Sequence, residues 1–193
     1  FAGGTTETVI PFLGSVDLGF FYYILAAVFI VGMVNAVNFT DGIDGLNTSV
    51  TLVVALVFSV IAMLLNRVGL SLYAAAIVGA MIGFLFWNAN PAKVFMGDTG
   101  SLFLGGAVCA LAFGVDMPIL LILIGIIYIV EILSVVLQVT YFKISHGKRI
   151  FKMAPIHHHF EMCGWNENKI CFVFSGVTLF AGIIGVLLAV FGC

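Results

Sequence analysis

The sequence predicts an all-α, polytopic integral membrane protein, and three observations support this fold class. Of the 193 residues, 63% are hydrophobic and only 8% are charged, and the mean hydropathy is +1.26. A soluble domain typically carries about 25% charged residues, so this chain has too little polar surface to cover a water-soluble globule. Its apolar residues also gather in six runs, each near the roughly 20 residues that a membrane-spanning helix needs.

The six predicted spans are separated by loops of different lengths. We expect them at about residues 20–36, 49–65, 70–87, 101–113, 118–142 and 170–191. The fourth run is short and reaches full length by including Thr99-Gly100. Closely spaced glycines suit tight helix packing in lipid. These are Gly79 and Gly83, Gly105 and Gly106, and Gly182 and Gly185.

Residues 1–19 precede the first span and have a different pattern from the transmembrane domain, residues 20–193. Glu7–Ile10 and Val16–Leu18 flank Gly14-Ser15, which is typical of a β-hairpin, here on the external surface. The chain begins at Phe1, with no Met and no basic leader. We therefore expect it to be the C-terminal part of a longer protein.

The six spans place the connecting loops alternately on two sides of the membrane. Loops 38–47, 88–100 and 143–169 share one side, and of the seven Lys and Arg residues only Arg67 falls on the other. The positive-inside rule assigns the first side to the cytoplasm. Most polar residues that could do chemistry lie on this side, so we expect the function to face the cytoplasm.

The first cluster of such residues follows the first span, in the sequence Asn38-Phe39-Thr40-Asp41-Gly42-Ile43-Asp44-Gly45. Two carboxylates are each followed by glycine, which permits tight turns and close approach of the backbone to a ligand. Asp41 and Asp44 could instead cap the next helix, since Asp is a favoured N-cap residue. Capping explains one acid and one glycine and leaves the repeat unexplained, so a ligand site is favoured.

A second cluster, Trp87–Ser101, contains Asn88 and leads into the fourth span with the sequence Phe95-Met96-Gly97-Asp98-Thr99-Gly100-Ser101. The start of a helix exposes N–H groups and the positive end of the helix dipole, which favours bound anions. Asp98 alone would oppose an anion, yet it suits an Mg²⁺ ion held between the protein and a diphosphate. A simple N-cap is the alternative for Asp98. Phe95 either stacks on a flat base or contacts lipid or the protein core.

The third cluster, Pro155–Glu161, contains three consecutive histidines and follows the basic residues Lys148, Arg149 and Lys152. Neighbouring side chains on a helix do not share a face, so the histidines are not expected to bind one metal ion together. They could instead donate to phosphates and hold the structure of the loop. The basic residues have a second explanation, because positive-inside loops carry such charges in any case.

Two polar side chains interrupt the fifth predicted span. Glu131 and Gln138 are seven residues apart and therefore lie nearly on one helix face. Ionisable groups within a membrane are costly and usually face a bundle interior or a cavity. Gln138 is near the cytoplasmic end and could reach the site, whereas the pattern assigns no role to Glu131.

Together these motifs resemble a known family. Asn38–Leu46, Phe95–Ser101 and Pro155–Glu161 are similar to the motifs of the phospho-N-acetylmuramoyl-pentapeptide transferases of bacterial peptidoglycan synthesis. The first two motifs are shared across the wider superfamily of polyprenyl-phosphate hexose-1-phosphate transferases, and the triple histidine is more particular to this branch. The resemblance covers essentially the whole chain, including the spacing of the spans.

The resemblance implies transfer of the phospho-sugar from UDP-N-acetylmuramoyl-pentapeptide to undecaprenyl phosphate, giving UMP and lipid I, with Mg²⁺ required. It also implies ten spans in the full protein, a homodimer, and a bacterial inner-membrane location with the active site on the cytoplasmic side. No nucleic acid is expected among the partners. The paired Asp-Asp motif that the family carries on an earlier loop has no match here, so we expect this chain alone to be inactive.

The resemblance further implies roles for individual residues. Asp98 resembles the Mg²⁺ ligand, and it forms the expected catalytic group with Asp41, His157 and His158. Phe95, Asn88 and the Gly42–Asp44 turn resemble the uridine and ribose pocket, and Asp41 lines the same cleft. His157 and His158 resemble contacts to the phosphates or the sugar, and Arg149 is expected to add another. The expected substrate-binding residues are Asn38, Gly42, Ile43, Asp44, Asn88, Phe95, Gly97, Ser101, Gln138, Arg149 and His159.

Three other interpretations of the sequence fit these motifs less well. A secondary transporter would hold its substrate near the bilayer midplane, whereas here the acids, histidines and glycines gather at one surface. A purely structural membrane protein does not need Gly-Asp-Thr-Gly-Ser at the start of a helix. Within the enzyme class, the alternative is a related transferase that uses a UDP-N-acetylhexosamine without the peptide, and the triple histidine argues against it. The sequence leaves open whether the reaction takes one step or passes through a covalent aspartyl intermediate.

Overall fold

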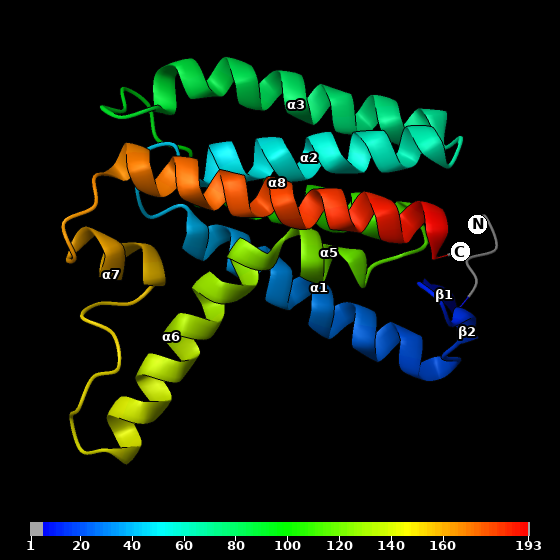
Figure 1. Cartoon of the computed structure of the whole chain (residues 1–193). Coiled ribbons are helices and arrows are strands. Elements are labelled where there is room, and N and C mark those ends of the chain that lie inside the picture. The colour runs from blue at the N-terminus through cyan, green and yellow to red at the C-terminus, as the bar shows by residue number, and fades with distance from the viewer. Residues whose placement is uncertain (1–5, 193) are drawn as a thin grey trace.

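Long helices make up most of the computed structural model, which describes residues 6–192 (Figure 1). Within these residues, six helices are long and apolar enough to cross a membrane, which confirms the predicted fold class. The helices are α1 (Phe20–Thr40), α2 (Leu46–Leu64), α3 (Val68–Asn88), α4 (Gly97–Gly114), α5 (Leu120–Ile124), α6 (Ile126–Ile144), α7 (Ile156–Glu161) and α8 (Glu167–Phe191). The strands are β1 (Glu7–Ile10) and β2 (Gly14–Asp17).

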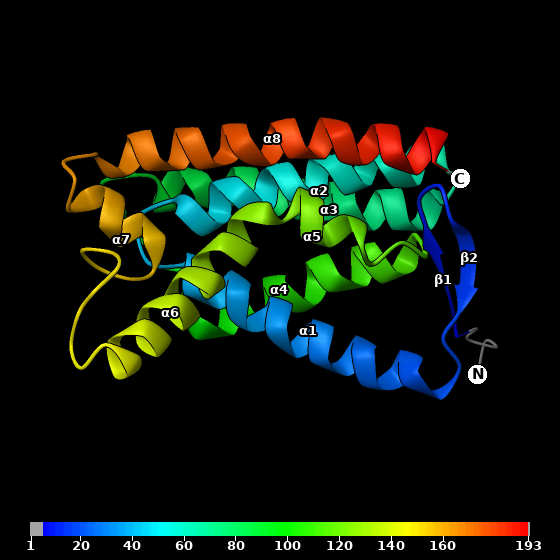
Figure 2. The ribbon, with the colours of Figure 1, turned by 60° about the horizontal axis from the view of Figure 1, so that its bottom comes forward.

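The fifth predicted span is wrong as a single helix, because the chain breaks at Gly125 into α5 and α6. Gly125 has φ −89° and ψ 27°, outside the helical region. A Cβ atom at this position would lie 2.7 Å from the carbonyl oxygen of Leu121 and 3.0 Å from the ring of Tyr128, so glycine permits the close packing of the break. Beyond it, α6 turns away from α8 and crosses α1 (Figures 1 and 2).

Two motif segments that were expected in loops are partly helical. Asn38, Phe39 and Thr40 form the last turn of α1, and Gly97 to Gly100 form the first turn of α4. The last helix begins at Glu167, three residues before the predicted start at Ile170. Polar residues at a helix end can satisfy the backbone groups left open there, so hydropathy alone underestimates the helix length.

The core forms around α2, which packs between α3 and α8, while α1 packs along α4 (Figure 2). Phe58 and Ile61 of α2 are fully buried. The hydroxyl groups of Thr51 and Tyr128, both buried, lie 2.7 Å apart and share a hydrogen bond. In contrast, α1 and α3 bury few of their apolar side chains, as expected for helices that face lipid.

The predicted tight packing at glycines holds for some positions and is wrong for others. A Cβ atom at Gly105 would lie 2.6 Å from the Cα of Val34, so α1 and α4 touch backbone to backbone there. Similarly, a Cβ atom at Gly182 would lie less than 3 Å from the side chain of Val57, and one at Gly185 less than 3 Å from the side chain of Ile124. Among the described residues, nothing lies within 4 Å of a Cβ at Gly79, Gly83 or Gly106. Sequence spacing does not show which helix face meets a neighbour.

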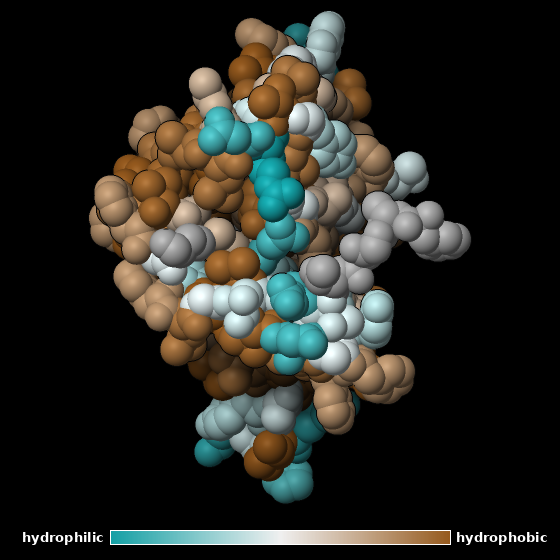
Figure 3. Space-filling view, turned by 90° about the vertical axis from the view of Figure 1, so that its right-hand side faces the viewer, coloured by the Kyte–Doolittle hydropathy of each residue, from teal (hydrophilic) through white to brown (hydrophobic). Residues whose placement is uncertain are grey.

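The predicted hairpin is confirmed, with β1 and β2 paired antiparallel and Glu7 opposite Asp17. Its turn is Pro11–Leu13, so Gly14-Ser15 begins the second strand rather than forming the turn. The hairpin is tied to the bundle because the Val9 N–H donates to the carbonyl of Asp116 at 2.9 Å. Viewed from this end, a band of hydrophilic side chains runs between hydrophobic flanks (Figure 3). The first five residues of the predicted hairpin segment lie outside the described residues.

The contact at Gly105 generates a direct test of the helix packing. Gly105→Ala should lower the melting temperature of the detergent-solubilised protein, because the facing atom is backbone and cannot rotate away. Overpacking of this kind costs about 1–3 kcal/mol. The matched control is Gly106→Ala, one residue along the same helix, where the added methyl group meets open space. Equal melting temperatures for the two variants would contradict the close approach of α1 and α4.

Candidate active site

Two distant segments of the chain line one cavity of about 250 Å³ at the end of the bundle opposite the hairpin. The first segment joins α1 to α2, and the second joins α3 to α4. All of the lining residues belong to the first two predicted clusters. They are Asn38, Asp41, Gly42, Ile43, Asp44, Asn88, Phe95, Gly97 and Asp98.

The two acids Asp41 and Asp98 come from different helix ends and share this cavity. The side-chain amide of Asn38 donates to Asp98 Oδ1 at 3.1 Å and to Ser101 Oγ at 2.8 Å. Ser101 is fully buried and lies beneath the cavity, where its hydroxyl also donates to the Gly97 carbonyl. Burial raises the pKa of Asp41, and the negative charge of Asp98 raises it further. The site thus concentrates negative charge that a bound cation would offset.

The donor set fits an Mg²⁺ ion. Mg²⁺ is usually held by one or two carboxylates and takes its other ligands from water and substrate phosphates. Asp98 and Asp41 supply two carboxylates, and no group of three or more His, Cys, Asp and Glu side chains gathers into a metal site anywhere in residues 6–192. The N-terminus of α4 begins at Gly97 on the same cavity, and such a helix end favours a bound phosphate.

Asp44 joins three segments of the chain around the cavity. Its Oδ2 accepts hydrogen bonds from the Ala92 backbone at 2.8 Å and from the Asn90 side chain at 3.3 Å. Its own backbone N–H donates to Glu167 Oε2 at 2.9 Å. The predictions missed Glu167, although an acid in the first turn of a helix is a recognisable signal. Asp44 therefore shapes the cavity as well as lining it.

Asn88 is a second residue that shapes the wall. Its side chain is 3% exposed, its Oδ1 accepts from the hydroxyl of Thr48 at 2.6 Å, and its Nδ2 donates to the carbonyl of Val94 at 3.0 Å. These bonds connect α2 to the loop before α4. Thr48 was not among the predicted site residues, since a buried hydroxyl inside a span carries no signal in the sequence.

Phe95 stands at the mouth of the cavity with 73% of its surface exposed. It lies in the loop before α4, three residues ahead of Asp98. A large exposed aromatic ring beside two carboxylates offers a flat surface next to a charged site. The geometry is that expected for a ring that stacks on a base while the charged part of the same ligand lies deeper.

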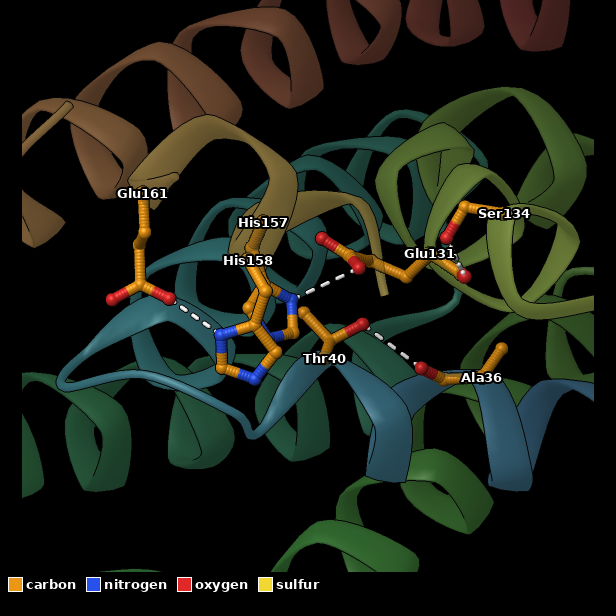
Figure 4. Close-up of polar contacts among 7 residues, drawn as sticks. All are labelled: Ala36, Thr40, Glu131, Ser134, His157, His158 and Glu161. Atoms are coloured by element: carbon orange, nitrogen blue, oxygen red, sulfur yellow. Dashed lines mark hydrogen bonds and ion pairs between the residues drawn. The ribbon is translucent and has the colours of Figure 1, made fainter. Parts of the chain in front are cut away.

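The three histidines of α7 have three different partners, as expected for neighbours on a helix, and Figure 4 shows those of His157 and His158. His157 is fully buried, and its Nδ1 lies 2.9 Å from Glu131 Oε2 on α6. His158 bonds to Glu161, and its ring lies 4.2 Å from the ring of His157. His159 accepts the backbone N–H of Lys152 at 3.1 Å, so it holds the loop. The structure places His157 behind the cavity wall, outside its lining.

Gln138 and Arg149 lie at a second cavity, of about 510 Å³, between α6 and the loop that precedes α7. The Oε1 of Gln138 accepts from the backbone N–H groups of Ile150 and Phe151, each at 3.0 Å, and its Nε2 donates to the carbonyl of Phe151 at 3.1 Å. Gln138 therefore fixes this loop. The structure does not bring these two predicted residues to the cavity of Asp41 and Asp98.

Comparisons with known proteins agree with the motifs. The glycosyl transferase family 4 profile matches residues 2–116. The chain is 52% identical over 181 residues to the phospho-N-acetylmuramoyl-pentapeptide-transferase of Clostridium botulinum, covering 93% of the chain and 56% of that protein. The chain is 55% identical over 175 residues to the Clostridium perfringens protein of the same name, and this match covers 90% of the chain and 54% of that protein. It is 49% identical over 190 residues to the Listeria monocytogenes protein of this name, and this match covers 97% of the chain and 59% of that protein.

The chain thus spans about half the length of the curated relatives it matches. All three relatives carry the same name, and the similarity extends over both clusters that line the cavity and over the histidine helix. The family profile itself covers more than half of the chain. The chain belongs to glycosyl transferase family 4 and, within it, is similar to the phospho-N-acetylmuramoyl-pentapeptide-transferases.

Proposed function

We propose that the full protein transfers phospho-N-acetylmuramoyl-pentapeptide from its UDP-linked form to undecaprenyl phosphate, with UMP and lipid I as products. The supporting observation is the cavity at the end of a membrane bundle, which is lined by Asp41 and by the N-terminal residues Gly97 and Asp98 of α4. Such a cavity combines a place for a cation with a place for phosphate. The names of the relatives point to the same reaction.

The reaction requires two anionic groups to approach each other. An oxygen of the lipid phosphate forms a bond to the sugar-linked phosphorus, and the bond from this phosphorus to the bridging oxygen breaks, so that UMP leaves with the electron pair. Positioning and charge stabilisation provide most of the catalysis in phosphoryl transfer. A site at helix ends suits a lipid substrate whose phosphate lies at the bilayer surface.

In this proposal Asp98, with Asp41 in the same cavity, would hold Mg²⁺, and the ion would supply charge to offset the repulsion between the phosphates. The backbone N–H groups at the start of α4 bind a phosphate oxygen, and Phe95 stacks on uracil. The turn from Gly42 to Asp44 approaches the uridine closely. His158, whose Nδ1 pairs with Glu161, would contact the sugar or a phosphate.

We further propose that the cavity faces the cytoplasm and that the protein is a homodimer. The support for the orientation is the distribution of Lys and Arg, which places the loops of the cavity on the positively charged side. The support for the homodimer is the family resemblance. Crosslinking in native membranes checks the oligomeric state, and labelling of a cysteine introduced at Asn90 from one side checks the orientation.

The proposed function is tested by a radiolabel transfer assay on the full-length protein. We expect transfer from UDP-N-acetylmuramoyl-pentapeptide to undecaprenyl phosphate, release of UMP, and loss of activity when Mg²⁺ is chelated. Parallel assays contain UDP-N-acetylglucosamine as the donor. Faster transfer from this second donor would contradict the proposal and identify the related transferase that acts without the peptide.

The role of Asp98 generates the second prediction. Asp98→Asn should lower kcat by about 100-fold or more, since even changes outside the direct ligands of a metal cost about 10–100-fold. The control is Asp116→Asn at the opposite end of the bundle, where the carboxylate pairs with the exposed Arg67. Near-normal turnover of Asp98→Asn at ordinary Mg²⁺ concentration would rule out the assignment.

The exposed ring of Phe95 generates the third prediction. Stacking of a base on an aromatic side chain contributes about 1–3 kcal/mol, so Phe95→Ala should raise the KM for the UDP-sugar about ten-fold or more. Phe86→Ala is the matched control, because Phe86 is 81% exposed on α3 and lies outside the cavity. An unchanged KM for the UDP-sugar with an altered KM for the lipid would place Phe95 against the membrane instead.

A further inference from the structure

Glu131 is a carboxylate within a membrane-spanning helix, α6, and its side chain is fully buried. The cavity residues and the proposed chemistry give it no task. An ionisable group at such a place is costly to bury and is commonly found paired and functional. Its only hydrogen-bonded side-chain partner among the described residues is His157, from the distant helix α7.

The pair fixes the orientation of the imidazole ring (Figure 4). Glu131 Oε2 lies 2.9 Å from His157 Nδ1, and both side chains are completely buried. An ionised carboxylate can only accept, so with Glu131 ionised the Nδ1 of His157 is the donor and Nε2 points the other way. Nε2 has no hydrogen-bond partner in the described part of the chain. The hydrogen bond to Glu131 is therefore the one polar contact that holds the ring in place there.

The other side of the ring touches the cavity wall. A Cβ atom at Gly42 would lie 2.2 Å from Nε2 of His157 and 2.6 Å from its Cε1. The imidazole thus occupies the space that a side chain at Gly42 would need. Gly42 stands between Asp41 and Ile43 in the lining of the cavity. The turn that carries Asp41 and Asp44 therefore packs against the imidazole ring of His157 through Gly42.

We propose that Glu131 is a positioning residue that acts through His157 on the Gly42 turn and so maintains the shape of the cavity for the UDP-sugar. The assignment of the ligand rests on the proposed function, whereas the chain of contacts does not. Without the carboxylate, the Nδ1–H group of His157 is buried without an acceptor, and the ring turns to find one. The turn then loses its support, and the UDP-sugar binds less tightly.

The kinetic test uses the full-length protein with Glu131→Leu, Glu131→Gln and Ser134→Ala. Leucine fills the space in a membrane helix without an acceptor, glutamine keeps an acceptor oxygen, and Ser134 is a buried α6 residue whose hydroxyl donates to the Glu131 carbonyl. Glu131→Leu should raise the KM for the UDP-sugar about ten-fold, as expected for one lost buried hydrogen bond. The KM for the lipid should change little, Glu131→Gln should recover most of the loss, and Ser134→Ala should match the wild type.

A second readout, hydrogen exchange followed by mass spectrometry, is independent of activity. Glu131→Leu should accelerate exchange in residues 41–45 and leave α2 and α8 protected, whereas Ser134→Ala should leave exchange in all of these segments unchanged. The positioning role would be overturned if Glu131→Leu accelerated exchange in all helices or left exchange in the turn unchanged. It would also be overturned if Glu131→Gln raised the KM for the UDP-sugar as much as Glu131→Leu. A wild-type protein without transferase activity, combined with the local exchange effect, would refute the proposed function and leave this inference standing.

The contact between the ring and the turn has its own test. Gly42→Ala should lower the melting temperature strongly, because its methyl group collides with the imidazole of His157. In the His157→Ala background the same substitution should cost much less, since the colliding ring is gone. Coupling of this kind is expected for residues in contact. An equal loss in the two backgrounds would show that His157 does not support the turn and would overturn the proposal.

Discussion

The exclusion of water from the membrane interior is the constraint on which this structure depends. Backbone N–H and C=O groups have no water to bond there, so each crossing must be a helix that satisfies its own backbone. Turns with exposed N–H groups and charged side chains are then restricted to the helix ends. The candidate site follows this rule, because Asp41 ends α1, Gly97 begins α4, and the loop after α3 closes the wall.

Two pairs of buried polar side chains meet inside the bundle. Thr51 bonds to Tyr128, and Glu131 bonds to His157. The break at Gly125 is part of the second pairing, because it turns α6 out of line with α5 and toward α1 and α7. A straight helix would continue in the direction of α5. The irregular residue in the membrane thus places the buried carboxylate behind the site.

Several features could be predicted from the sequence because they depend on neighbouring residues. Runs of apolar side chains determine six crossings through their hydropathy, and the alternation of these crossings determines which loops share a side. The Lys and Arg residues predict that the side of the cavity loops is the cytoplasmic one. The Asp-Gly repeat from Asp41 and the stretch from Phe95 to Ser101 identify two cavity segments, since flexible glycines beside acids indicate a site for a charged ligand. The family could be recognised from the same short motifs. Helix boundaries were less predictable, because the ends of α1 and α4 use polar residues to continue the helix.

The tertiary structure alone decided which of these residues meet. Asn38 reaches Asp98 and Ser101, and Glu167 reaches the backbone of Asp44, through contacts between residues far apart in the chain. Gln138 and Arg149 share the polarity of the site residues, yet the direction of α6 takes them to a second cavity. By itself the sequence determined the fold class, the crossings and the acidic motifs, which are set by local composition. The helix-packing geometry decided which glycines touch a neighbour and gave Glu131 its partner, because these depend on the rotation and crossing of helices, which residue spacing does not specify.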